Sequence, residues 1–230
     1  MTDDISAIHA FKEECLHLLT PNHDRSLHIF LWSVVGLIFI GSYIGCADRF
    51  TWFLEVVPVI FGTMVLLAFY DSFRFSRLVC CFLCAHAIVL MIGGHYTYAE
   101  VPLFNWLRDA CHLSRNYYDR LGHFFQGFVP ALIAREFLIR RNVLNRRSWL
   151  NFLVVSICLA ISAAYELFEW QAAVWTGTKA DAFLGSQGDP WDTQWDMATA
   201  LIGAIVAVLF MPRLHDASIA KLQSYDSTKI

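Results

Sequence analysis

Six long apolar stretches constrain this chain more than any other feature of its sequence. A helix needs roughly 20 mostly apolar residues to cross the hydrocarbon core of a bilayer. The stretches that meet or approach this length are Leu27–Gly45, Trp52–Tyr70, Leu78–Gly93, Leu121–Ile139, Leu150–Phe168 and Met197–Met211. Composition agrees, because 57% of the 230 residues are hydrophobic and 16% are charged, against about 45–50% and about 25% in soluble domains. The sequence therefore predicts an all-α, polytopic membrane helix bundle of about six transmembrane helices.

The positions of lysine and arginine predict how this bundle is oriented. Eleven of them fall on the side that holds both termini, and five fall on the other side. Since lysine and arginine collect in cytoplasmic loops, we expect both termini in the cytoplasm and the bundle in the bacterial inner (cytoplasmic) membrane. Residues 1–26 would then form a cytoplasmic N-terminal segment, either an interfacial helix or a solvated one. Residues 27–212 would form the six-span domain, and residues 213–230 a cytoplasmic tail.

Acidic and histidine side chains collect at the predicted outer side of the membrane. They are His95 after the third span, Asp119 and His123 at the start of the fourth, Glu166 and Glu169 at the end of the fifth, and Asp189, Asp192 and Asp196 around the start of the sixth. Residues three or four positions apart share one face of a helix, so each group presents its side chains together. Ordinary helix caps and solvated carboxylates would explain any one group, but their shared level predicts one common site.

A bound divalent cation is the simplest way to offset the cost of so many carboxylates in a bilayer. Like charges and desolvation both disfavour the ionised forms, whereas carboxylate and imidazole groups together suit Mg, Mn, Fe or Zn. The predicted ligands are His123, Glu166, Asp192 and Asp196, with Asp119 or Glu169 as the general base and His95, Asp189 and Gln126 as possible additional members of the site. The identity of the metal stays open. Arg115 and Arg120 could instead pair with some of the acids.

Three further expectations concern the start of the sixth span, Glu136 and His86. Pro190 is tolerated in the first turn of a helix, so the sixth span is expected to begin early, with Asp189 as its N-cap. Glu136 is predicted to form an intramembrane structural pair with Arg135. His86, in the middle of the third span, is expected to bond to a neighbouring carbonyl.

Four motifs in this order resemble the YjdF-like bacterial inner-membrane proteins. They are GGHYTYAEVPL, NYYDRLGHFFQG, YELFEW and GDPWDTQWDM, and the resemblance runs from about Trp32 to about Pro212. It implies a multi-span inner-membrane protein and no particular activity. A looser similarity is to VanZ-like membrane proteins. In this chain Asp119, His123, Glu166, Asp196 and Gly203 would match the order of the corresponding residues in that family. The additional spans at the N-terminal side of this chain depart from that pattern.

Two classes of function compete for such a protein. The first is a metal-dependent hydrolase or transferase that acts on lipid-linked or envelope substrates, in which the cation polarises a phosphoryl or acyl oxygen or activates water. The alternative is a membrane protein that binds a cation or small molecule without turnover, as a transporter or sensor. A di-iron oxidase and an assembly factor are further alternatives. The expected partners are the lipid bilayer and a lipid head group or envelope small molecule. The net charge of −3 gives no reason to expect nucleic acid.

Overall fold

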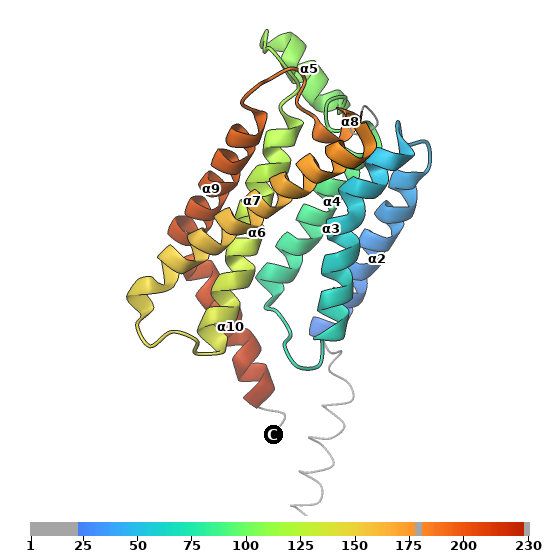
Figure 1. The fold of residues 1–230 in the computed structure, drawn as a ribbon. Coiled ribbons are helices and arrows are strands. Elements are labelled where there is room, and N and C mark those ends of the chain that lie inside the picture. The colour runs from blue at the N-terminus through green and yellow to red at the C-terminus, as the bar shows by residue number, and fades with distance from the viewer. Residues whose placement is uncertain (1–22, 178–180, 228–230) are drawn as a thin grey trace, which may run out of the picture.

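The computed structural model describes residues 23–177 and 181–227, and every regular element in them is a helix. These are α2 (His23–Tyr43), α3 (Arg49–Ala68), α4 (Arg77–Tyr96), α5 (Pro102–Ala110), α6 (Tyr118–Arg140), η1 (Arg147–Trp149), α7 (Leu150–Thr176), α8 (Asp181–Leu184), α9 (Asp192–Phe210) and α10 (Pro212–Ser227). The predicted all-α bundle is confirmed (Figure 1). The predicted N-terminal segment falls almost entirely outside the described residues.

Six of these helices are long enough to cross a membrane. Five of them, the helices α2, α3, α4, α7 and α9, are also apolar enough by composition. The sixth, α6, has 23 residues, which corresponds to roughly 34 Å at the usual rise. It carries five charged side chains, all turned away from the surface or nearly so: Asp119, Arg120, Arg135, Glu136 and Arg140. Charged groups in such a position face the bundle interior and not lipid.

Helix α6 occupies the centre of the bundle and runs alongside α4, α7 and α9 (Figure 1). Its closest neighbour is α9, because small residues let the two backbones approach. A Cβ atom added to Gly127 would overlap the Ala200 carbonyl oxygen, and one added to Gly203 would overlap the Phe124 carbonyl oxygen. The main hydrophobic core lies around this contact and includes the fully buried Leu132.

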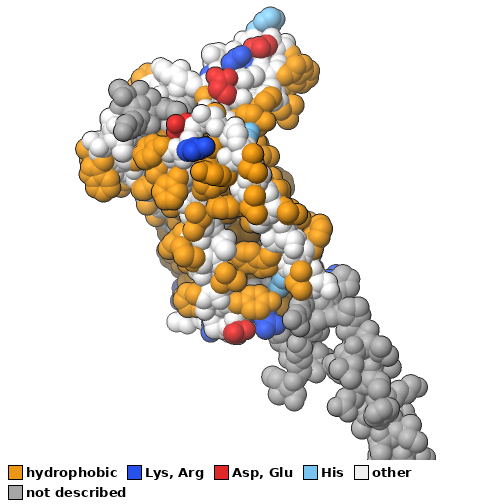
Figure 2. Space-filling model, turned by 90° about the vertical axis from the view of Figure 1, so that its right-hand side faces the viewer, with side chains coloured by type: hydrophobic (Ala, Val, Ile, Leu, Met, Phe, Trp, Pro, Cys, Tyr) orange, Lys and Arg blue, Asp and Glu red, His pale blue; other side chains and the backbone are white. Residues whose placement is uncertain are grey.

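Helices α2 and α3 form a second layer against α4 (Figure 1). Trp52 anchors this layer, since its indole N–H donates to the Ser42 hydroxyl (3.0 Å). The surface of α2 and α3 away from α4 is apolar and exposed, with Phe30 and Phe61 each 63% accessible. Figure 2, which looks at the side of the bundle where α2 lies, shows hydrophobic side chains over most of its height and charged ones toward its two ends. That distribution is expected of a surface in contact with lipid.

The two ends of the bundle differ. The end where the predicted acidic and histidine side chains collect is called the site end, and the opposite end is called the far end. At the site end α6 and α9 begin and α7 ends; at the far end α6 and α9 end and α4 begins. Residues 213–227 of the predicted cytoplasmic tail belong to α10, which docks at the far end by way of His215. This side chain is fully buried, and its Nε2 lies 3.1 Å from Glu136 Oε2.

The predicted pair between Glu136 and Arg135 is wrong, because the two side chains have other partners. The buried Glu136 carboxylate accepts hydrogen bonds from the Ser76 backbone N–H (2.8 Å) and hydroxyl (2.6 Å) at the start of α4, and from Arg140 (2.9 Å). Arg135 pairs with Asp216 of α10 at 2.8 Å. Adjacent residues on a helix point in different directions, so Glu136 and Arg135 serve two different contacts.

Two smaller expectations also need correction. Helix α9 does begin early, but Trp191 and not Asp189 precedes its first residue. Asp189 instead accepts a hydrogen bond from the Trp191 backbone N–H at 2.9 Å, in a turn that follows Gly188 at φ +84°. His86 packs against Phe125, and among the described residues its Nε2 has no hydrogen-bond partner.

Candidate functional site: a buried carboxylate and histidine cluster

Four helices bring carboxyl groups together around His123 at the site end. The group consists of Glu55 of α3, Asp119 of α6, Glu166 and Glu169 of α7, and Asp192 and Asp196 of α9, with the half-buried Asp189 just before α9. Six of these seven carboxyl groups are at least nine-tenths buried. The basic groups of the cluster are the two guanidinium groups of Arg115 and Arg120 and the imidazole of His123. The cluster thus holds more acid than its own bases can neutralise.

The two arginines bind the acids of α9 and of the segment before it. Arg115 contacts Asp192 at 2.5 Å and Arg120 contacts the same oxygen at 2.6 Å. Each arginine also lies 3.6 Å from Asp189. Arg120 extends further, to Asp119 at 3.2 Å and to Asp196. Asp192 is therefore occupied by arginine, as the alternative reading of the sequence anticipated, and lies outside the groups that could hold a metal ion.

Arg115 also joins the start of α6 to the loop before α9. Its guanidinium donates to the backbone carbonyls of Gly185 (2.9 Å) and Ser186 (3.1 Å). Next to it, Asn116 and Gln187 exchange two hydrogen bonds between backbone and side chain, at 3.0 and 2.9 Å. These contacts position the segment that carries Asp189 and Asp192.

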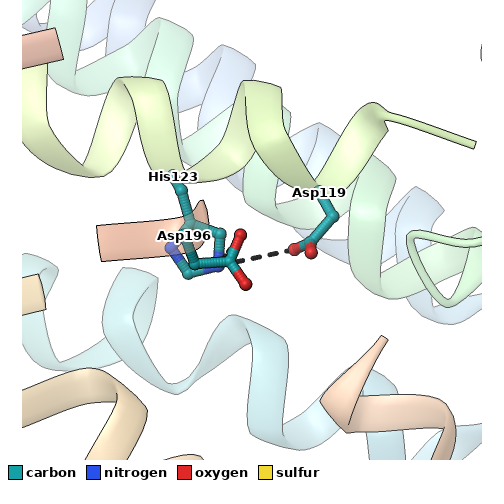
Figure 3. Close-up of side chains that lie close together, drawn as sticks. All are labelled: Asp119, His123 and Asp196. Atoms are coloured by element: carbon teal, nitrogen blue, oxygen red, sulfur yellow. Dashed lines mark ion pairs between the residues drawn. The ribbon is translucent and has the colours of Figure 1, made fainter. Parts of the chain in front are cut away.

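His123 is shared by two groups that could hold a metal ion. One consists of Asp119, His123 and Asp196 (Figure 3), and the other of His123, Glu166 and Glu169; within each, the ligand atoms lie within 4.8 Å of one another. Nε2 of the ring lies 3.4 Å from Asp119 Oδ1 and 3.5 Å from Asp196 Oδ1. Both groups include residues that the sequence predicted as ligands or as the base.

Gln126 determines which ring nitrogen is available. Its Oε1 lies 2.9 Å from His123 Nδ1, and an amide oxygen can only accept a hydrogen bond. Nδ1 is therefore the donor in this contact, and Nε2, which faces Asp119 and Asp196, is the ring nitrogen that could bind a cation once it is deprotonated. Metal-binding histidines commonly donate their second N–H to a protein oxygen in this way. Gln126 was predicted as an additional member of the site, and it lies at the position of such a partner.

Glu166 and Glu169 lie on the other side of the imidazole. Glu166 Oε1 is 3.8 Å from His123 Nδ1, too far for a hydrogen bond, and this buried atom has no hydrogen-bond partner among the described residues. Burying a polar atom without a partner is costly, so such an atom indicates a missing proton, water or ligand. Glu169 and Glu55 lie close enough to Asp119 and His123 to interact with both electrostatically.

His95 is the predicted site residue that the fold keeps apart. Its Nδ1 lies 2.8 Å from the Ser42 carbonyl oxygen of α2, and its ring contacts Tyr96. It joins α4 to α2 and is absent from both groups around His123. This arrangement matches the interfacial role that histidine and tyrosine often have in membrane proteins.

Two tyrosines of the cluster were not predicted. Tyr165, just before Glu166, packs edge-on to the His123 ring at 6.3 Å, and its buried hydroxyl has no partner among the described residues. Tyr98 follows α4 in a left-handed conformation (φ +53°), and its ring covers Gly93, where a Cβ would overlap it. Burial, with the nearby Glu55, raises the pKa of the Tyr98 phenol well above its ordinary value, so this group stays protonated.

The comparisons with known proteins agree that the chain is a membrane protein. Residues 27–217 match the model of a family described as "Predicted membrane protein (DUF2238)". The chain is also similar to the inner membrane protein YjdF of Escherichia coli (strain K12), with 50% identity over 179 residues; the alignment covers 78% of this chain and 86% of that relative. No solved structure matches the chain.

Proposed function

We propose that this chain, which belongs to this family of membrane proteins and is a multi-pass protein of the inner membrane, is a cation-dependent hydrolase or transferase. Its substrate would be a lipid-linked or envelope molecule that reaches the site end of the bundle. The observation that carries the proposal is the buried triad of Asp119, His123 and Asp196 with Nε2 of the imidazole turned toward both carboxylates (Figure 3).

The donor set fits a divalent cation. Two carboxylates and one imidazole suit Mn, Fe or Zn, and such a set leaves coordination positions open, as catalytic sites require. The excess of carboxyl groups over arginines supports the proposal, because a divalent cation would offset part of the cost of burying them. A bound cation would polarise a phosphoryl or acyl oxygen or activate water.

The remaining residues can be given roles from their positions. Glu166 lies next to the triad with a buried, unpartnered oxygen, which suits a group that accepts a proton from the attacking water or hydroxyl. Glu169 interacts electrostatically with Glu166 and would favour proton uptake there by repulsion. Arg120 now pairs with Asp119 and Asp196; a cation that took its place there would leave its guanidinium to stabilise an anionic oxygen of the substrate.

Metal content tests the first half of the proposal. The full chain, purified in detergent without chelator, is expected to carry one divalent cation per molecule by elemental mass spectrometry. The variants Asp196→Asn and His123→Gln should lose it, and Glu166→Gln should keep it. Glu100→Gln is the matched control, because this exposed acid accepts a hydrogen bond from Asn105 and belongs to neither group around His123. A parent protein without stoichiometric metal, even after reloading with Mn²⁺ or Zn²⁺, would contradict the proposal.

Turnover tests the second half. Proteoliposomes that contain phosphatidic acid can be assayed separately for released inorganic phosphate and for released fatty acid, which distinguishes phosphoryl from acyl chemistry. The parent should show metal-dependent release of one product, and Glu166→Gln should lose this release while retaining the cation. Stoichiometric metal with neither product would favour the alternative function, cation or small-molecule binding without turnover.

A further inference from the structure

A cavity of about 160 Å³ lies between α2, α3 and α4, away from the carboxylate cluster. Helices α2 and α3 both pack against α4, and their side chains meet at two levels. Toward the site end Trp52 packs against Phe39 and Tyr43 (ring centroids 5.2 and 4.9 Å apart), and at the far end His28 Nδ1 lies 3.0 Å from the Tyr70 hydroxyl. The cavity occupies the length between these contacts. Figure 2 looks onto this side, where the hydrophobic surface is hollowed near mid-height.

The lining of this cavity is apolar along most of its length. Leu31, Val35, Val59, Leu66, Leu83 and Leu90 contribute to its wall. Thr63 and His86 are the polar side chains within this length; an enclosed apolar cavity of about 150 Å³ accepts a small hydrocarbon, so the remaining lining favours part of a hydrocarbon chain over water. Toward the site end the space is closed by buried hydrophobic residues, among them Val56 and Met91. An occupant must therefore be a hydrocarbon, and any polar end must point the other way.

The far end of the cavity carries positive charge. Phe73 and Arg74 both line it, and the Arg140 and Arg141 guanidinium groups lie 4.2 and 5.2 Å from the Phe73 ring. Arg140 is already paired with the buried Glu136. Arg74, with 40% of its side chain exposed, lies over the Tyr70 ring (4.9 Å), and its one acidic contact in the described part of the chain is a loose one of 3.8 Å with Asp71, which is 97% exposed. Arg74 and Arg141 thus leave a net positive charge at the mouth.

We propose that this cavity binds one hydrocarbon chain of an anionic amphiphile whose head group lies beside Arg74. The chain fills the apolar length between α2, α3 and α4, and the carboxylate or phosphate binds the guanidinium by charge-assisted hydrogen bonds. The exposed apolar faces of α2 and α3 contact lipid, so such a molecule can enter from the bilayer. A free fatty acid and a membrane phospholipid both have this chemistry. The site is independent of the proposed cation and of its chemistry.

Photolabelling of the full chain in detergent tests the chain-binding part. A palmitate analogue with a diazirine near the end of its chain is expected to label peptides of α2 and α4 that line the cavity, and unlabelled palmitate should compete. Gly62→Leu should reduce this labelling at least tenfold, since Gly62 lines the cavity and a Cβ there meets no atom within 4 Å. Gly36→Leu is the matched control, because Gly36 has equally open space but lies on the exposed face of α2.

Three outcomes would overturn this part. They are labelling of wild-type protein that unlabelled palmitate does not reduce, labelling confined to the outer faces of α2 and α3, and equal labelling in Gly62→Leu and Gly36→Leu. The competition experiment needs no variant, so the proposal stays testable even if Gly62→Leu fails to fold.

The anionic head group is tested with a probe that has the same hydrocarbon chain but an alcohol in place of the carboxylate. A diazirine fatty alcohol should label the cavity several-fold less than the fatty acid, and Arg74→Gln should remove that difference. Arg213→Gln, an exposed arginine at the start of α10, is the control and should preserve it. Equal labelling by acid and alcohol in the wild type would overturn the anionic head group. Unlabelled phosphatidylglycerol as a competitor of the diazirine fatty acid distinguishes the source of the ligand. Reduced labelling in its presence supports a phospholipid, and reduced labelling by palmitate alone supports a free fatty acid.

Discussion

The close contact between α6 and α9 allows us to predict how much a substitution there lowers the unfolding free energy. This contact lies one helical turn from the triad of Asp119, His123 and Asp196. Gly127 and Ala200 each follow a triad residue, His123 and Asp196, by four positions on the same helix. A Cβ at Gly127 would overlap the Ala200 carbonyl oxygen and lie 2.9 Å from the Ala200 Cα. Backbone atoms cannot rotate away as a side chain can, so Gly127→Ala must move the two helices apart.

The size of the effect follows from two opposing contributions. Forcing extra atoms into a packed interior costs about 1–3 kcal/mol, whereas replacing glycine by alanine inside a helix gains roughly 0.5–1 kcal/mol. Gly36→Ala in α2 has the same gain without the overlap, since a Cβ there meets nothing within 4 Å. The difference in unfolding free energy between the two variants therefore isolates the overlap, and should be about 1–3 kcal/mol.

Reversible unfolding in mixed micelles, followed by tryptophan fluorescence, measures this difference. Gly127→Ala should also weaken the proposed cation site, because separating α6 from α9 draws Asp196 away from the His123 ring, now 3.5 Å distant. If Gly127→Ala proved as stable as Gly36→Ala and bound metal equally well, the close packing of α6 on α9 would not be what positions the triad.

Three other predictions concern the arginine contacts, the far end and the topology. Asp192→Asn should lower stability by about 1.5–3 kcal/mol, since its carboxylate accepts from Arg115 and Arg120, yet leave metal content unchanged; loss of the metal would make Asp192 a ligand after all. Glu136→Gln should lower the unfolding free energy by about 3–5 kcal/mol and speed amide hydrogen exchange in α10, whereas the exposed Asp71→Asn should do neither. Equal exchange in both variants would contradict a role of the Glu136–His215 contact in docking α10. Both termini are predicted to be cytoplasmic, so a C-terminal fluorescent-protein fusion should fluoresce and a C-terminal alkaline phosphatase fusion should be inactive; the reverse pattern would invert the predicted topology.

The spans could be read from the sequence because hydrophobic length is a local property. A helix does form over the predicted stretch Leu121–Ile139, as α6, although its charged residues leave it outside the five helices that are apolar enough by composition to cross a membrane. Helix ends were less accurate: α7 continues to Thr176, eight residues beyond the predicted span. A bundle interior that is polar at one end lets a helix continue with acids on its buried face, and hydropathy alone then ends the span too early.

The cluster was predictable only in part, because local spacing shows which residues share a helix face and not which atoms meet. The spacings of Asp119 with His123 and of Glu166 with Glu169 showed that each pair shares one helix face, and in the structure both pairs lie around the His123 ring. The choice of partner for Arg115 and Arg120 among several equivalent acids depends on the loop before α9, which no local pattern specifies. Glu136 shows the same limit, since its partners Ser76 and His215 lie 60 and 79 residues away.

The most direct test of the central claim is anomalous diffraction from crystals of the full chain loaded with Mn²⁺ in the absence of chelator. The account predicts one strong peak per molecule between the Asp119 and Asp196 carboxylates and His123 Nε2, with Gln126 still hydrogen-bonded to Nδ1. A crystal at saturating Mn²⁺ with no peak at this position, or with Arg120 still bridging the two carboxylates there, would contradict it.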